Sequence, residues 1–212
     1  MIFEPSHIYH IYNQGNNRQK IFFNRENYLF FLKKINEHIL PFADILAWCL
    51  MPNHFHLLVY VRGSEDSEGF TLSEALTPTA ETLTALTPTP YKTLNDSIGV
   101  LLRSYTRAIN KQRNTSGSVF RKKTKAECIS KGFTLSYPDS KGFTQSEALT
   151  KVLTDKEYLQ TCFDYIHQNP TKSGLVAHPE KWEFCSWLDY SGIRNGKLIN
   201  RERAAEFGLG AK

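Results

Sequence analysis

One stretch, residues 47–60, constrains the fold more than any other part of this sequence. It is rich in aromatic and β-branched residues and contains the turn signal Pro52-Asn53, a pattern that predicts a β-strand around His54. Successive side chains of a strand point to opposite faces of the sheet. We therefore expect His54 and His56 to lie side by side on one face, with Phe55 pointing into the opposite layer.

Two neighbouring imidazoles suit a divalent metal or a bound phosphate better than they suit a hydrophobic core. The spacing alone does not establish a metal site, since most short His-X-His pairs carry no metal. Other motifs in the chain are needed to distinguish a metal site from a His-X-His pair that carries no metal.

Composition permits one domain with a sizeable core. The chain has 212 residues, of which 41% are hydrophobic and 13% aromatic. Its net charge of +5 and pI of about 8.9 allow a nucleic-acid partner without requiring one, and a basic enzyme of another kind fits equally well.

Cysteine spacing and the apolar content of the chain indicate where the protein resides. The four cysteines are far apart and include no C-x-x-C pair, so we expect reduced, mostly buried thiols rather than a zinc site or a disulfide scaffold. No signal-like N-terminus and no run of eighteen apolar residues occurs. We therefore expect a cytoplasmic protein with no membrane partner.

Periodicity and turn residues predict four strands and three main helices. The expected strands span residues 7–13, 44–50, 51–62 and 126–129. The expected helices span about 25–39 with Asn24 as N-cap, about 97–112 capped by Asn95-Asp96, and from Asp155 to Asn169-Pro170. Strand, helix, strand, strand, helix, strand is the order of a ferredoxin-like α/β sandwich, with an antiparallel sheet and helices on one face.

Two segments, 63–93 and 130–152, interrupt this pattern. They are rich in Thr, Ser, Pro and Glu, and the peptide at 69–77 recurs at 142–150 with a single difference. Such separated copies do not form a stacked repeat fold. We interpret them as repeat-containing loops inserted into a single domain, 1–212, with no part in the chemistry, because lengthening a surface loop costs little.

Basic residues are concentrated in two segments of the sequence. The loop at 13–20 combines Gly and Asn with cations and suits a phosphate backbone, or is an ordinary solvated turn. The helix at 97–112 has a basic side, and further cations follow it around Phe120, a pattern typical of a backbone-tracking groove or of a solvated charged face. The candidate DNA-binding residues are Arg18, Arg103, Arg107, Lys111, Arg121, Lys122, Lys123 and Lys125.

Short motifs spread along the chain share one resemblance. The most specific are Met51-Pro52-Asn53-His54-Phe55-His56-Leu57-Leu58 and, later, Asp164-Tyr165-Ile166-His167-Gln168-Asn169-Pro170; the others lie at 11–17, 116–120, 174–176 and 182–187. In this order they resemble the REP-associated tyrosine transposase branch of the single-tyrosine HUH transposase family. The resemblance covers nearly everything except the two insertions.

This resemblance implies metal-dependent cutting and rejoining of single-stranded DNA beside a hairpin, by a monomer or a homodimer. His54 and His56 match the metal ligands, Tyr165 the nucleophile that forms a 5′-phosphotyrosine bond, and Asn169 a polar third ligand. Residues four apart share one helical face, so Tyr165 and Asn169 can both point at a metal held by the strand. Two imidazoles, an amide oxygen and water suit Mg²⁺ or Mn²⁺.

Other interpretations of these residues stay open. Tyr165 is also compatible with a core aromatic, and Asn169 with a residue that merely ends a helix before Pro170. Tyr105, on the basic helix, is a rival nucleophile that lacks a polar partner four residues on. Asp164 and His167 are candidate proton acceptors, whereas His7, His10, His38 and His178 have no partner pattern and are expected to be structural.

At the level of function, the alternatives are a non-catalytic nucleic-acid-binding module on the same scaffold and a conventional transposase that moves its own gene.

Overall fold

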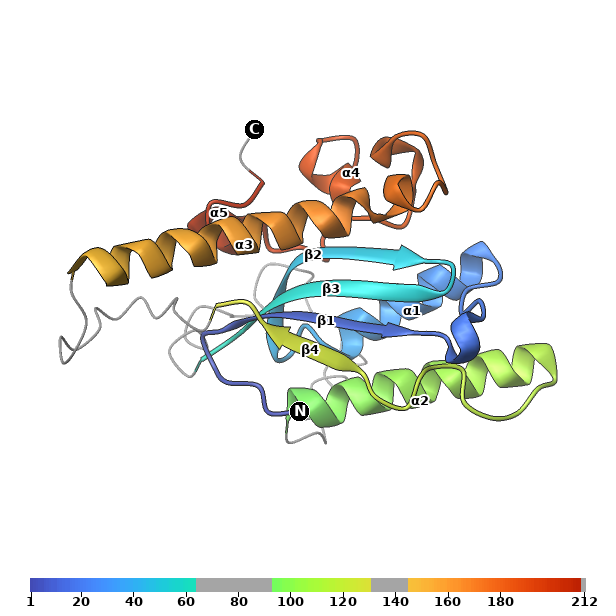
Figure 1. The fold of residues 1–212 in the computed structure, drawn as a ribbon. Coiled ribbons are helices and arrows are strands. Elements are labelled where there is room, and N and C mark those ends of the chain that lie inside the picture. The colour runs from blue at the N-terminus through green and yellow to red at the C-terminus, as the bar shows by residue number, and fades with distance from the viewer. Residues whose placement is uncertain (64–92, 131–144, 211–212) are drawn as a thin grey trace, which may run out of the picture.

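The computed structural model describes residues 1–63, 93–130 and 145–210, with side chains from residue 156 in the last of these segments (Figure 1). Their elements, in chain order, are β1 (Ile8–Gln14), the 3-10 helix η1 (Asn16–Arg18), α1 (Arg25–His38), β2 (Ala43–Met51), β3 (His54–Val61), α2 (Leu94–Arg113), β4 (Lys125–Cys128), α3 (Gln145–Lys172), the 3-10 helix η4 (Pro179–Lys181), α4 (Trp187–Tyr190) and α5 (Arg201–Glu206).

The strands form one antiparallel sheet in the order β2-β3-β1-β4. This is the sheet of a ferredoxin-like sandwich, so the predicted fold class is confirmed. Helices α1 and α2 cover one face as predicted, but the expectation that helices occupy only one face is wrong, because α3 crosses the opposite face (Figure 1). Both faces of the sheet are apolar, and each requires a cover.

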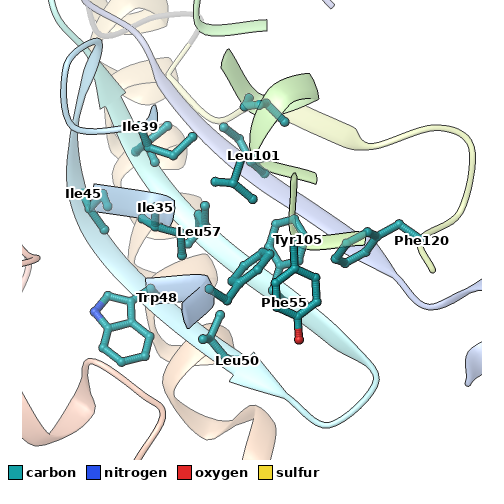
Figure 2. Packing of buried hydrophobic residues seen from close by; sticks show 14 of the residues in the cluster. Ile35, Ile39, Ile45, Trp48, Leu50, Phe55, Leu57, Leu101, Tyr105 and Phe120 are labelled. Atoms are coloured by element: carbon teal, nitrogen blue, oxygen red, sulfur yellow. The ribbon is translucent and has the colours of Figure 1, made fainter. Parts of the chain in front are cut away.

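The first core lies between the sheet and the helices α1 and α2 (Figure 2). Phe55 of β3 is 2% exposed, and its ring centre lies 5.1 Å from that of Phe31. Ile35 of α1 and Leu101 and Tyr105 of α2 also belong to this cluster. The helical residues in this core recur three or four positions apart, as expected for one apolar face of each helix.

The second core lies between the sheet and α3. Ile8 and Leu58 point from the sheet toward Leu159, Phe163 and Ile166 of α3, and all five are buried. Because strand side chains alternate, the residues of β1 and β3 that face α3 are the even-numbered ones, and this set includes both histidines of β3.

The N-termini of α1 and α2 differ in how well the sequence predicts them. Asn24 caps α1 as expected, with Oδ1 accepting from the backbone N–H of Asn27 at 3.0 Å. The cap predicted for α2 is wrong: Thr93, not Asn95-Asp96, precedes the helix. The Thr93 hydroxyl accepts from the Asp96 N–H at 3.1 Å and donates to the Asp96 carboxylate at 2.8 Å.

Helix α3 is longer at both ends than predicted. It begins at Gln145 rather than Asp155, because the residues between them are mostly good helix formers with no Gly or Pro. It continues through Pro170 to Lys172. Pro170 lies in the last turn, where its missing N–H removes one helical hydrogen bond, the one to the Ile166 carbonyl, and Gly174, at φ 70°, follows the end of the helix.

Most of each predicted insertion, 64–92 and 131–144, lies outside the described residues, so the loop assignment for these segments stays a prediction. For residues 145–152 the loop assignment is wrong, because they form the first turns of α3. Within the described part of the chain, no helix has the length and apolarity needed to cross a bilayer.

Candidate active site

The two histidines of β3 stand where the sheet meets α3. His54 is the first residue of β3, and His56 is 5% exposed and faces α3, while Phe55 between them lies in the first core. Their ring centres are 5.0 Å apart. The strand prediction for these three side chains is therefore confirmed.

The amide of Asn169 lies between the two imidazoles. Its Oδ1 is 3.3 Å from Nε2 of His54, and its Nδ2 is 3.1 Å from Nε2 of His56. One helical turn earlier, Tyr165 is 39% exposed, and its ring stands edge-on to His56 at 5.5 Å between centres. The structure thus brings together His54, His56, Tyr165 and Asn169 from one chain.

Hydrogen positions make this site suited to a cation. Nδ1 of His54 donates to Oδ1 of Asn53 at 2.6 Å, so Nε2 of the neutral ring carries a lone pair and no hydrogen. That lone pair faces Oδ1 of Asn169, which is itself an acceptor. Two acceptors meeting at 3.3 Å are an arrangement that a cation between them would stabilise.

Burial keeps both histidines in the form that binds metal. It lowers the pKa of His54, and it lowers the pKa of His56 further, where His10 and His54 add to the effect. A neutral imidazole is the species that ligates a metal. Among the described residues, no group of three or more His, Cys, Asp and Glu side chains is placed to hold an ion. The candidate donors at this site are therefore limited to two imidazoles and the amide oxygen of Asn169.

A cavity of about 250 Å³ opens beside these residues. It is lined by His54, His56 and Tyr165 together with three cations, Arg121, Lys123 and Lys125. Its size and charge suit a phosphate group more than a large organic ligand.

A larger groove of about 1030 Å³ runs between α2 and residues 118–124. Of the predicted DNA-binding residues, this groove is lined by Arg103, Arg107, Arg121, Lys122 and Lys123. Arg121 and Lys123 line both hollows and therefore connect the groove to the histidines. Arg18 and Lys111 line neither of these two hollows.

The rival nucleophile Tyr105 is on the wrong side of the sheet for this site. It is fully buried in the first core (Figure 2), and its hydroxyl donates to the Ile21 carbonyl at 2.7 Å. Burial also raises the pKa of the Tyr105 phenol. Its position and its hydrogen bond indicate a structural role.

The two candidate proton acceptors on α3 are separated. His167 is buried, its Nε2 is hydrogen-bonded to Oγ of Ser186 at 2.8 Å, and burial lowers its pKa to about 3. Asp164 lies at the surface, where its carboxylate accepts from Nε2 of Gln160 at 3.0 Å.

Three residues of the site were not predicted from sequence. His10 of β1 is buried, and its Nε2 lies 2.9 Å from Nδ1 of His56. It was expected to be only a structural residue, but it contacts a residue of the candidate site. Nearby, the Tyr12 hydroxyl donates to Oε1 of Glu127 at 2.5 Å, which raises the pKa of Tyr12 to about 12. The sequence feature that could have identified His10 and Tyr12 is their alternation with the core residue Ile11, because this places both on the same face of the strand.

Comparison with known proteins gives no matching family model and no matching curated protein. Among solved structures, a REP-associated tyrosine transposase bound to a REP hairpin is similar to this chain, with a TM-score of 0.51, 12% identity, and 95% of each chain covered. At this identity the two chains share a fold, and the roles of the site residues have to be argued from their geometry.

Proposed function

We propose that this chain is a metal-dependent endonuclease and strand transferase that cuts single-stranded DNA beside hairpins and holds one end as a 5′-phosphotyrosine. The observation that carries the proposal is the convergence of Nε2 of His54 and of His56 on the Asn169 amide, at 3.3 and 3.1 Å, one helical turn from Tyr165. The fold shared with a transposase bound to a REP hairpin supports it.

His54, His56 and Oδ1 of Asn169 would hold Mg²⁺ or Mn²⁺. When bound, this ion supplies polarisation of the phosphoryl oxygens and orients the phosphate for attack. Arg121, Lys123 and Lys125, which line the same cavity, would offset the charge of the incoming phosphate.

Tyr165 is the nucleophile in this proposal. Its hydroxyl loses a proton and its oxygen forms a bond to phosphorus, while the bond from phosphorus to the 3′ oxygen breaks and that oxygen takes up a proton. A free phenol has a pKa of about 10 and is a weak nucleophile without activation. The covalent bond conserves the energy of the phosphodiester, so a second 3′-hydroxyl can reverse the step without ATP.

The test is a denaturing-gel assay with a labelled hairpin oligonucleotide that carries single-stranded flanks, incubated with Mn²⁺. We expect a covalent adduct that disappears in Tyr165→Phe and persists in Tyr158→Phe, a matched control on the same helix that is 50% exposed. An adduct that survives in Tyr165→Phe would refute the nucleophile assignment. Hairpin binding by the wild type without any adduct would instead favour the non-catalytic binding module.

A mixing experiment tests whether one chain completes the site. Because His56 and Tyr165 meet within a single chain, we expect an equimolar mixture of His56→Ala and Tyr165→Phe to form no adduct. Recovery of activity in the mixture would show that two protomers exchange α3. The distinction from a transposase that moves its own gene rests on the gene's surroundings, where scattered palindromes favour the proposed type and paired element ends the other.

A further inference from the structure

A third imidazole stands behind the two proposed metal ligands. His10 lies in β1 on the face that α3 covers, and it is 7% exposed. Its ring lies beside that of His56, with centres 5.0 Å apart and planes inclined by 26°. Its Nε2 lies 2.9 Å from Nδ1 of His56, so the two rings share one hydrogen.

The neighbouring hydrogen bonds determine where this hydrogen belongs. Nδ2 of Asn169 is a donor and lies 3.1 Å from Nε2 of His56, so that nitrogen accepts with its lone pair. The hydrogen of neutral His56 is therefore on Nδ1, from which it is donated to Nε2 of His10. His10 in turn carries its own hydrogen on Nδ1.

We propose that His10 is a positioning residue that holds His56 in the Nδ1–H tautomer, so that the Nε2 lone pair, which here accepts from Nδ2 of Asn169, is available to a metal that displaces this hydrogen bond. This inference rests on the proposed function, since it concerns the same ion. Its physical basis is that an imidazole ligand is oriented by the partner of its second nitrogen. Without an acceptor at Nδ1, the His56 hydrogen can move to Nε2 and occupy the lone pair that the metal needs.

Two substitutions separate this role from simple packing. His10→Phe keeps an aromatic ring in the buried position but has no acceptor. His10→Gln restores an acceptor without a ring. Loss of such a partner typically weakens metal binding about 10- to 100-fold. We therefore expect His10→Phe to bind Mn²⁺ at least about tenfold more weakly than the wild type, and His10→Gln to recover part of that loss.

The measurements are Mn²⁺ affinity by titration calorimetry and the tautomer of His56 by long-range ¹H–¹⁵N NMR of the metal-free protein. We expect Nδ1–H in the wild type and a shift toward Nε2–H in His10→Phe. An unchanged tautomer in His10→Phe, or a changed tautomer with unchanged Mn²⁺ affinity, would overturn the proposal. If His10→Phe does not fold, an Nε2–H tautomer in the wild type alone refutes it.

The two readouts also distinguish this inference from the proposed function. A wild-type protein that binds no Mn²⁺ but shows the Nδ1–H tautomer, lost in His10→Phe, refutes the metal site and supports the positioning role. Normal Mn²⁺-dependent adduct formation with an Nε2–H tautomer of His56 refutes the positioning role and leaves the proposed function intact.

Discussion

Tyr105 and Tyr165 are the two candidate nucleophiles. Removing the hydroxyl of each should have opposite effects on stability and on adduct formation. Tyr105 is fully buried, and its hydroxyl donates to the Ile21 carbonyl at 2.7 Å. Tyr105→Phe leaves that carbonyl buried without this donor, which costs about 2 kcal/mol of unfolding free energy. For a chain of this size the melting temperature should fall by about 4–8 °C. DNA adduct formation, measured well below the melting temperature, should be retained.

Tyr165→Phe is the matched counterpart. Tyr165 is 39% exposed, and within the described part of the chain its hydroxyl makes no hydrogen bond to protein. Its removal should change the unfolding free energy by less than about 0.5 kcal/mol while abolishing the adduct.

The assay is urea unfolding of both variants, followed by circular dichroism and by tryptophan fluorescence, with adduct formation measured on the same preparations. Coincidence of the two transitions checks that unfolding is two-state. The reasoning is refuted if Tyr105→Phe is as stable as the wild type, or if Tyr165→Phe is the less stable variant of the two.

Five further outcomes are expected. Phe55→Ala should lose about 3–5 kcal/mol of stability in urea unfolding, since Phe55 is 2% exposed, and a loss below about 1 kcal/mol would contradict the packing. Asp189→Asn should lose about 2–3 kcal/mol in the same assay, because the buried carboxylate accepts from Arg194 at 2.7 and 2.8 Å; an unchanged midpoint would contradict this. Chelation by EDTA should abolish adduct formation, and Asn169→Ala, but not the exposed Gln168→Ala, should weaken Mn²⁺ binding at least about tenfold in calorimetry. Deletion of residues 64–90 should leave the adduct yield unchanged, and loss of activity in a folded deletion variant would show that this insertion has a role.

Local sequence patterns were sufficient to predict how several side chains of the site are placed relative to one another. The alternation of a strand depends only on neighbouring residues, so it placed His54 and His56 on one face and Phe55 on the other. Helical spacing likewise placed Tyr165 and Asn169 on a common side of α3. The metal and the nucleophilic role assigned to these residues remain predictions.

Long-range pairing explains what the sequence did not reveal. His10 meets His56 across 46 residues because Tyr12 is the register partner of His56 in the β1–β3 ladder, and no local pattern encodes that register. The cover that α3 provides for the second face of the sheet was missed for a similar reason. The surface that Leu159, Phe163 and Ile166 of α3 bury is formed by strands far away in sequence.

A single rigid helix carries both Tyr165 and Asn169, with consequences for how the site could be controlled. Each residue of an α-helix advances about 1.5 Å along the axis and turns about 100°, so the offset between the phenol and the amide is set by helical pitch. A loop movement cannot bring one of them closer to the sheet without the other. Any motion that opens this site must slide, tilt or unwind α3, and one residue inserted between the two would rotate the phenol about a quarter-turn away from the histidines.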